Sequence, residues 1–305
     1  MQWFEDPAIV RQLPRHFRVY AAYCRMMVDG HRGVVRGGSF LLRVSRRLSP
    51  LFGWADNARV IINGRTIYLD LLDSRVLTVF GEMSEYGLES VVLARAIHQG
   101  DTFLDIGANH GSFSLLARDR VGESGSVIAF EPQPRLAMLL QRSFEANGFS
   151  NCVVHNLALH ERTGTMELFI PATGSGSAGL YERFSATGAY QRATVEVAPF
   201  DQAVEWQRLP GKIFMKIDAE GSELAIIAGA EQMLRQRRPE ILLELNPTSA
   251  TAAGYSVREL LERLFDFGYT HGSELDQYPR GVPLRDLDDS RQRNVIIQVN
   301  SIAGR

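Results

Sequence analysis

Residues 105–111, Asp-Ile-Gly-Ala-Asn-His-Gly, constrain the fold of this chain more than any other stretch. They follow the apolar run 102–104, which is typical of a buried strand, and they precede an apolar helical pattern that begins at Ser112. Two glycines four residues apart favour a tight turn where the backbone approaches a ligand closely, because a side chain at either position would obstruct it. The segment therefore predicts a strand, a ligand-binding turn and a helix.

Glu131 ends the next apolar run, 126–130, and lies twenty residues after Gly111. An acidic side chain at the tip of the second strand can hold the two hydroxyls of an adenosine ribose. A dinucleotide fingerprint needs glycines at its first, third and sixth positions, and this turn has Asn109 at the third and Ser112 at the sixth. The pattern favours a ligand with a ribose but no pyrophosphate, and S-adenosylmethionine is the common one.

The strand and helix patterns alternate through the rest of the chain. Further strands are expected at 152–156, 213–217 and 241–245, with helices at 86–99, 135–147, 222–237 and 256–267 and a final hairpin formed by 294–299 and the residues from Tyr269 onward. Residues 165–170 and 194–198 predict an added strand pair. This order predicts an α/β fold with a doubly wound, mostly parallel, seven-stranded Rossmann-like sheet and helices on both faces.

The composition excludes several classes of protein. The 305 residues are 45% hydrophobic and carry a net charge of −2, so we expect one large core and no nucleic-acid partner. Two cysteines cannot form a disulfide framework. No run reaches the roughly 18 apolar residues of a membrane span, and the N-terminus lacks a signal peptide's apolar core. We therefore expect a cytoplasmic protein without stable membrane insertion.

Four segments resemble the motifs of the FkbM-type methyltransferases, in the order of that family. They are residues 100–111, residues 127–132, the Lys-Ile-Asp-Ala-Glu-Gly-Ser-Glu-Leu block at 216–224, and residues 238–244. The resemblance spans about residues 82–300. It implies a class I methyltransferase that depends on S-adenosylmethionine and usually acts on a hydroxyl of a small molecule or sugar.

The chain divides into two parts on this basis. Residues 81–305 are the predicted methyltransferase domain, and residues 1–80 are an N-terminal extension. The extension is expected to hold a helix within 9–28, with arginines off its apolar stripe, and a hairpin within 59–69 around Asn63-Gly64. It is also the segment through which a homo-oligomer could form.

The candidate cofactor-binding residues lie at the carboxyl ends of the predicted parallel strands, where ligands bind in such folds. They are Asp105, Gly107, Ala108, Asn109, Gly111, Glu131, Pro132, Asn156, Ala158 and Asp218. The cofactor that they are expected to bind is S-adenosylmethionine.

Asp218 and Glu220 are the candidate catalytic residues. A hydroxyl acceptor must lose a proton during methyl transfer, and a carboxylate at a strand end can act as the base. The alternative for Asp218 is a cap for the helix that begins near Ser222. Asp218, Glu220 and Glu244 could also hold a hydrated Mg²⁺, although no metal site is assigned, because neighbouring carboxylates are common without a metal.

The expected function is O-methylation of a small molecule, sugar or natural product. The alternative within the class is N-methylation of an amine or peptide. A nicotinamide-dependent oxidoreductase would use the same fold, and a non-catalytic nucleoside-binding module would retain the fold alone. The Gly/Ser-rich residues 172–184 are expected to be either a mobile lid over the acceptor or an ordinary connection between two strands.

Overall fold

The computed structural model describes residues 57–70, 73, 75–83, 87–171, 174–182 and 190–299. The helix predicted within 9–28 and Cys24 lie outside these residues. The suggestion that the extension forms a homo-oligomer stays a prediction. None of the helices described is long and apolar enough to cross a bilayer.

An eight-stranded sheet forms the centre of the molecule, in the order β12-β11-β13-β10-β9-β3-β4-β5. Five strands are parallel: β3 (Thr102–Ile106), β4 (Ser126–Phe130), β5 (Cys152–His155), β9 (Ile213–Ile217) and β10 (Glu240–Leu245). Three are antiparallel: β11 (His271–Glu274), β12 (Val282–Pro283) and β13 (Arg293–Gln298). The predicted α/β class is confirmed. The strand β12 was not predicted, because a strand of two residues shows no periodic pattern in the sequence.

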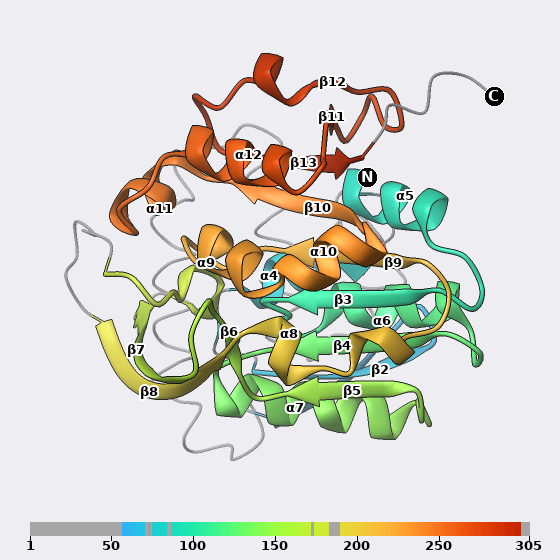
Figure 1. The fold of residues 1–305 in the computed structure, drawn as a ribbon. Coiled ribbons are helices and arrows are strands. Elements are labelled where there is room, and N and C mark those ends of the chain that lie inside the picture. The colour runs from blue at the N-terminus through green and yellow to red at the C-terminus, as the bar shows by residue number, and fades with distance from the viewer. Residues whose placement is uncertain are drawn as a thin grey trace, which may run out of the picture.

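Helices cover both faces of this sheet, and Figure 1 shows α6 behind β3 with α10 in front of it. One face carries α4 (Val76–Met83), α5 (Leu88–Ala96), α6 (Ser112–Val121) and α7 (Pro134–Ala146). The other carries α8 (Phe200–Ala203), α9 (Glu223–Gly229), α10 (Glu231–Arg237), α11 (Pro247–Ala252) and α12 (Val257–Asp266). Because side chains alternate along a strand, Phe103 belongs to the first core and Leu104 to the second.

The predicted hairpin is present as β1 (Ala58–Ile62) and β2 (Arg65–Leu69). Its second strand lies on α7, where the backbone N–H of Tyr68 donates to Ser143 Oγ at 2.9 Å. The buried side chains of the hairpin share a core with α6 and α7. The domain boundary at residue 80 stays a prediction.

A second, three-stranded sheet contains the predicted strand pair, now β7 (Gly164–Pro171) and β8 (Tyr190–Ala198), together with the short β6 (Ala158–Leu159). It projects beyond the carboxyl ends of β3, β4 and β5 (Figure 1). The single helix predicted at 222–237 is wrong, because the structure has α9 and α10 with a break at Ala230. The preceding Gly229 lies against the backbone of His160, where an added Cβ would be 2.2 Å from the carbonyl oxygen.

Candidate active site

The turn after β3 joins the ends of three strands. The backbone N–H groups of Gly107 and Ala108 both donate to the carbonyl of Phe130, at 3.0 Å each. Gly107 has a φ of 76°, and a Cβ added there would be 2.0 Å from the backbone oxygen of Asp218. Only glycine satisfies both conditions, so the turn approaches β4 and β9 closely.

Glu131 lies at the tip of β4 and is 3% exposed. Its Oε2 accepts from the N–H of Asn109 at 2.7 Å, and its Oε1 accepts from the N–H of Gln133 at 2.9 Å. Burial raises the pKa of Glu131 to about 7 against the lowering effect of these bonds. Asn156 supports this tip, because its Nδ2 donates to the carbonyl of Glu131 at 2.9 Å.

A hollow opens beside this turn, at the carboxyl ends of the parallel strands. Seven of the predicted site residues line it: Gly107, Asn109, Glu131, Pro132, Ala158, Asp218 and Glu220. The other four, Asp105, Ala108, Gly111 and Asn156, are not among the lining residues, and their direct contact with a cofactor stays a prediction.

Asp105 is buried beneath the turn. Ser114 Oγ donates to its Oδ2 at 2.6 Å, and Lys216 Nζ lies 4.0 Å from its Oδ1. Lys216 also forms an ion pair with Asp218 Oδ2 at 3.2 Å. Burial raises the pKa of the Asp105 carboxyl, and the Lys216 charge opposes that shift. The buried lysine thus connects Asp105 under the turn to Asp218 at the edge of the hollow.

The Asp218 carboxylate pairs with Lys216, and its side chain is 30% exposed. The N-cap of α9 is Ser222, and it makes no side-chain cap hydrogen bond. Glu223 holds the loop before the helix, because its Oε1 accepts from the N–H of Ala219 and its Oε2 from the N–H of Gly221, at 3.0 Å each. The carboxylate of Asp218 therefore borders the hollow next to this loop.

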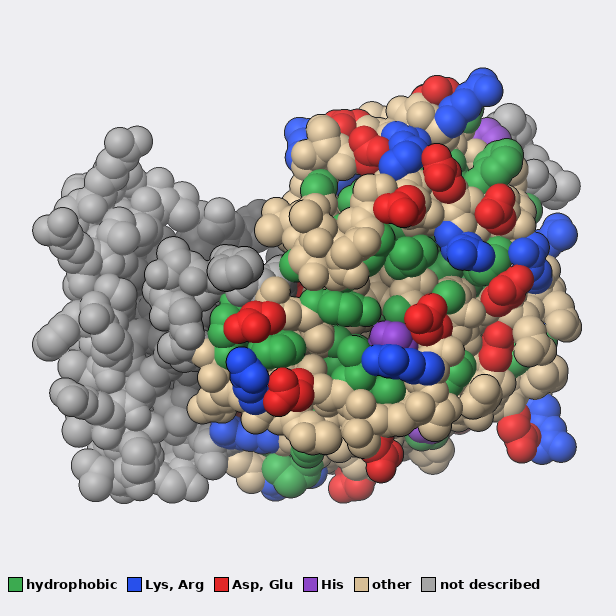
Figure 2. Space-filling model, turned by 60° about the vertical axis from the view of Figure 1, so that its left-hand side comes forward, with side chains coloured by type: hydrophobic (Ala, Val, Ile, Leu, Met, Phe, Trp, Pro, Cys, Tyr) green, Lys and Arg blue, Asp and Glu red, His purple; other side chains and the backbone are tan. Residues whose placement is uncertain are grey.

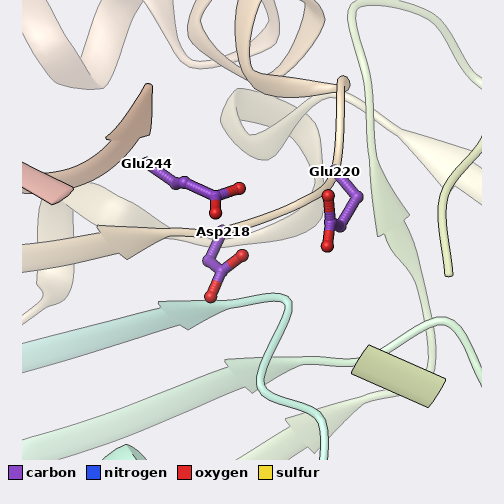
Figure 3. Close-up of side chains that lie close together, drawn as sticks. All are labelled: Asp218, Glu220 and Glu244. Carbon is purple, nitrogen blue, oxygen red and sulfur yellow. The ribbon is translucent and has the colours of Figure 1, made fainter. Parts of the chain in front are cut away.

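Three carboxylates converge here from the ends of β9 and β10 (Figure 3). One oxygen from each of Asp218, Glu220 and Glu244 lies within 4.8 Å of the others. Glu220 has a φ of 52°, uncommon for a side-chain-bearing residue, and accepts from Ser249 Oγ at 3.2 Å. Burial, and then the charges of Asp218 and Glu220, raise the pKa of Glu244 to about 7. The cluster can accept protons, and its acidity alone does not define a metal centre.

Residues 174–182 lie over the hollow. Gly179 pairs with Phe169 of β7 through two backbone hydrogen bonds of 2.9 and 3.2 Å. The N–H of Ser175 donates to both carboxylate oxygens of Asp73 at 3.1 Å, and Asn109 Nδ2 donates to Ser175 Oγ at 3.0 Å. The described part of the predicted lid thus covers the site, while residues 172–173 and 183–184 lie outside the description. Whether the segment moves stays a prediction.

The sequence interpretation missed other residues that line the hollow. Arg75 and Gln133 carry polar groups there, and Leu168 carries an apolar one. Arg75 comes from a segment without a motif, so only the fold brings it to the site. Ser175 and Leu180 also line the hollow, and both lie within the segment 172–184 predicted as a possible lid. On the neighbouring surface, acidic and basic side chains are interspersed with apolar ones (Figure 2).

Comparison with known proteins gives a family match over the site and most of the parallel part of the sheet. The model of the methyltransferase FkbM domain matches residues 105–270, which is more than half of the chain. The matched region contains every predicted site residue. A comparison with curated proteins found no match.

The fold is similar to that of several solved structures at low identity. The methyltransferase FkbM from Methylobacillus flagellatus KT is 17% identical with a TM-score of 0.40, over 73% of this chain and 53% of that one. The chain thus spans about half of that relative. Aeropyrum pernix fibrillarin, solved in complex with S-adenosyl-L-methionine, is 13% identical with a TM-score of 0.37, over 67% of this chain and 68% of that one.

The family match includes most of the residues that form the hollow. Among them are the turn after β3, the acidic tip of β4 and the Lys216–Glu220 block at the end of β9. This chain therefore belongs to the FkbM methyltransferase family.

Proposed function

We propose that this chain transfers a methyl group from S-adenosylmethionine to a hydroxyl of a small molecule, sugar or natural product. The observation that carries the proposal is that Glu131 and Asp218 border one hollow, with the turn at Gly107 between them. An acceptor for ribose hydroxyls and an acceptor for a proton are the two groups that this reaction requires.

The residues of the hollow fit S-adenosylmethionine. The Glu131 carboxylate can accept hydrogen bonds from the two ribose hydroxyls, because each oxygen retains lone-pair capacity beyond its bond to the backbone. Pro132, Leu157 and Ala158 offer apolar surface for the adenine. When bound, the cofactor supplies an electrophilic methyl group on a sulfonium.

Asp218 is the proposed base, with Glu220 beside it. The hydroxyl acceptor loses its proton to the Asp218 carboxylate while its oxygen forms the new bond to the methyl carbon and the carbon–sulfur bond breaks. Lys216 holds this carboxylate through the 3.2 Å ion pair. Residues of the segment 174–182 line the hollow, and their proposed role is to exclude water from it during the transfer.

The test is incubation of the full chain with S-adenosylmethionine labelled in its methyl group and a fractionated extract of host cells. We expect a labelled small molecule in which mass spectrometry and NMR place the methyl on oxygen. A methyl on nitrogen would support the alternative of N-methylation. Tight NAD binding without S-adenosylmethionine binding in calorimetry would refute the proposal.

A further inference from the structure

Arg75 is a cation at the edge of the hollow that the reaction proposed above does not use. It precedes α4 and lies in the chain well before residues 105–270, which match the family. Its side chain is 19% exposed, and it lines the hollow together with Asn109, Gly176 and Asp218. The question is which ligand group a buried guanidinium at this position recognises.

The guanidinium is held in place from two sides. Its Nη2 donates to Glu82 Oε1 at 2.7 Å, and the other oxygen of Glu82 accepts from the hydroxyl of Ser112 at the start of α6. The backbone of Gly176 packs on its stem, because a Cβ added there would lie 2.8 Å from Arg75 Cδ. Arg75 is therefore fixed between the helix that follows the cofactor turn and the segment that covers the hollow.

Arg75 retains donors for a ligand. A guanidinium has five N–H groups in a planar fork, and the ion pair with Glu82 engages only one of its nitrogens. Burial acts to lower the pKa of Arg75, but the nearby carboxylates of Glu82, Asp218 and Asp73 together outweigh it and raise this pKa, so Arg75 stays charged at any working pH. A planar cation with donors toward a hollow is suited to bind a carboxylate.

Charged side chains of both signs line this edge of the hollow. Arg75 supplies a positive charge, and Asp218, a lining residue as well, supplies a negative one. A free anion would be repelled by the carboxylates, whereas a zwitterion places its ammonium near them and its carboxylate near the arginine. The amino-acid end of S-adenosylmethionine is such a zwitterion, and Arg75 and Asp218 line the same hollow as Glu131, the proposed acceptor for its ribose.

We propose that Arg75 binds the carboxylate of the methionine part of the cofactor. This inference rests on the proposed function. It assigns a cofactor-binding residue to the segment before the matched family region, and so makes residues outside that region part of the cofactor site.

The test compares two ligands and two variants in calorimetry. S-adenosylhomocysteine has the amino-acid end, and 5′-methylthioadenosine has the same nucleoside without it. Arg75→Gln should weaken S-adenosylhomocysteine binding by roughly 10- to 100-fold and change 5′-methylthioadenosine binding by less than about twofold. Arg75→Lys, which keeps the charge but loses the fork, should lie between Arg75→Gln and the wild type.

Arg65→Gln is the matched control, because Arg65 also forms an ion pair, with Asp119, and its side chain is 14% exposed, but it does not line the hollow. It should leave the binding of both ligands unchanged. Equal weakening of both ligands by Arg75→Gln would assign Arg75 a structural role and overturn the inference. Unchanged binding with a raised KM for the acceptor would overturn it too, because Arg75 would then contact the acceptor.

The proposed function and this inference fail in different ways. A wild-type chain that binds neither ligand refutes the cofactor itself, and with it both proposals. A wild-type chain that binds both ligands, together with an Arg75→Gln variant that binds them equally well, refutes only the assignment of Arg75. Thermal unfolding of each ligand-free variant shows that it is folded.

Discussion

The wall of the hollow that we propose to bind the nucleoside, called the nucleoside wall, is formed by Gly107, Asn109 and Glu131 and comes from the ends of two adjacent strands, β3 and β4. The opposite wall, called the acid wall, is formed by Asp218 and Glu220 from the end of β9 and the loop after it, with Glu244 of β10 close behind them. Hydrogen bonds from backbone N–H groups hold the nucleoside wall, as in the bond from Asn109 to Glu131. Side-chain contacts hold the acid wall, as in the ion pair of Lys216 with Asp218.

This difference indicates which wall of the hollow is more sensitive to amino-acid substitution. Backbone hydrogen bonds depend on the turn itself and change little when neighbouring side chains change. Contacts between side chains depend on each partner, so single substitutions can reshape the acid wall and the acceptor that it admits. Four predictions test this comparison, from the largest expected effect to the smallest.

The largest effect is expected for Asp218→Asn. This change keeps the shape of the side chain but removes the base, so kcat should fall by roughly 10²- to 10⁴-fold. The affinity for S-adenosylhomocysteine should fall far less than kcat, because the ribose contacts of Glu131 stay intact while only one charge near the ligand's ammonium is lost. Steady-state kinetics and calorimetry check both. A variant with wild-type turnover would show that the carboxylate is a spectator.

Gly107→Ala should disrupt both walls together. The new Cβ would lie 2.0 Å from the backbone oxygen of Asp218, and φ at this position is 76°. We expect a loss of about 3–4 kcal/mol in the free energy of unfolding, measured with urea. Gly148→Ala is the matched control, since its φ is 70° and its added Cβ would have nothing within 4 Å.

The control isolates the contact between the walls. Gly148→Ala should lose only the cost of the left-handed conformation, about 1–2 kcal/mol. Equal losses in the two variants would mean that Gly107 is required for its φ alone, and that its close approach to β9 adds nothing.

Glu131→Ala should weaken S-adenosylhomocysteine binding by about 2–4 kcal/mol, because the ribose loses its charged acceptor. The pH dependence of the wild type is the sharper measurement. The pKa of Glu131 is raised to about 7, so the carboxyl is protonated at pH 6 and ionised at pH 8. The ionised form accepts more strongly, and binding should tighten as the pH rises through 7.

Glu131→Gln provides the control for that pH dependence. The amide keeps one carbonyl acceptor and does not titrate, so its weaker affinity should be constant between pH 6 and pH 8. A wild type whose affinity is also constant over this range would contradict the assignment of Glu131 to the ribose.

The smallest effect is expected for Glu244→Gln, which removes one charge from the acid wall. The pKa of Glu244, about 7 in the folded chain, exceeds the ordinary 4.5. A carboxyl raised in this way contributes stability below pH 4.5 that is lost as the pH rises through 7. The free energy of unfolding of the variant should therefore exceed that of the wild type by about 1–2 kcal/mol at pH 8, and the two should be equal at pH 4.5.

Chemical denaturation at the two pH values measures this difference. An equal difference at both would trace the effect to packing rather than to charge. A variant that is less stable than the wild type at pH 8 would show that the Glu244 charge is favourable, as expected for a wall that needs its full negative charge.

Much of the nucleoside wall could be predicted from the sequence, because its physical requirement is local. A buried strand, a glycine turn and an acidic strand end can each be recognised from a few consecutive residues. The predicted strand at 126–130, for example, has the same bounds as β4. The register of the parallel strands then brings Asp105 opposite Lys216 without a further signal in the sequence.

The contribution of Arg75 could not be predicted, because it is one of many arginines and nothing local distinguishes it. Ser175 lies in the segment predicted as a possible lid, but that Gly/Ser-rich stretch has no periodicity that would single out one residue. The helix α4 also escaped prediction, since its β-branched residues and Gly81 weaken the helical pattern. Arg75 and Ser175 reach the hollow only through tertiary packing.

On the proposed function, the contact of Gly107 with the backbone of Asp218 joins the turn that binds the methyl donor to the base. The N–H of Asp218 also donates to the carbonyl of Ile106 at 3.1 Å, so the two strand ends cannot shift independently. A substitution elsewhere that moves β9 against β3 should therefore alter cofactor affinity and turnover in parallel, whereas an exchange of residues 174–182 should leave these two strand ends in place.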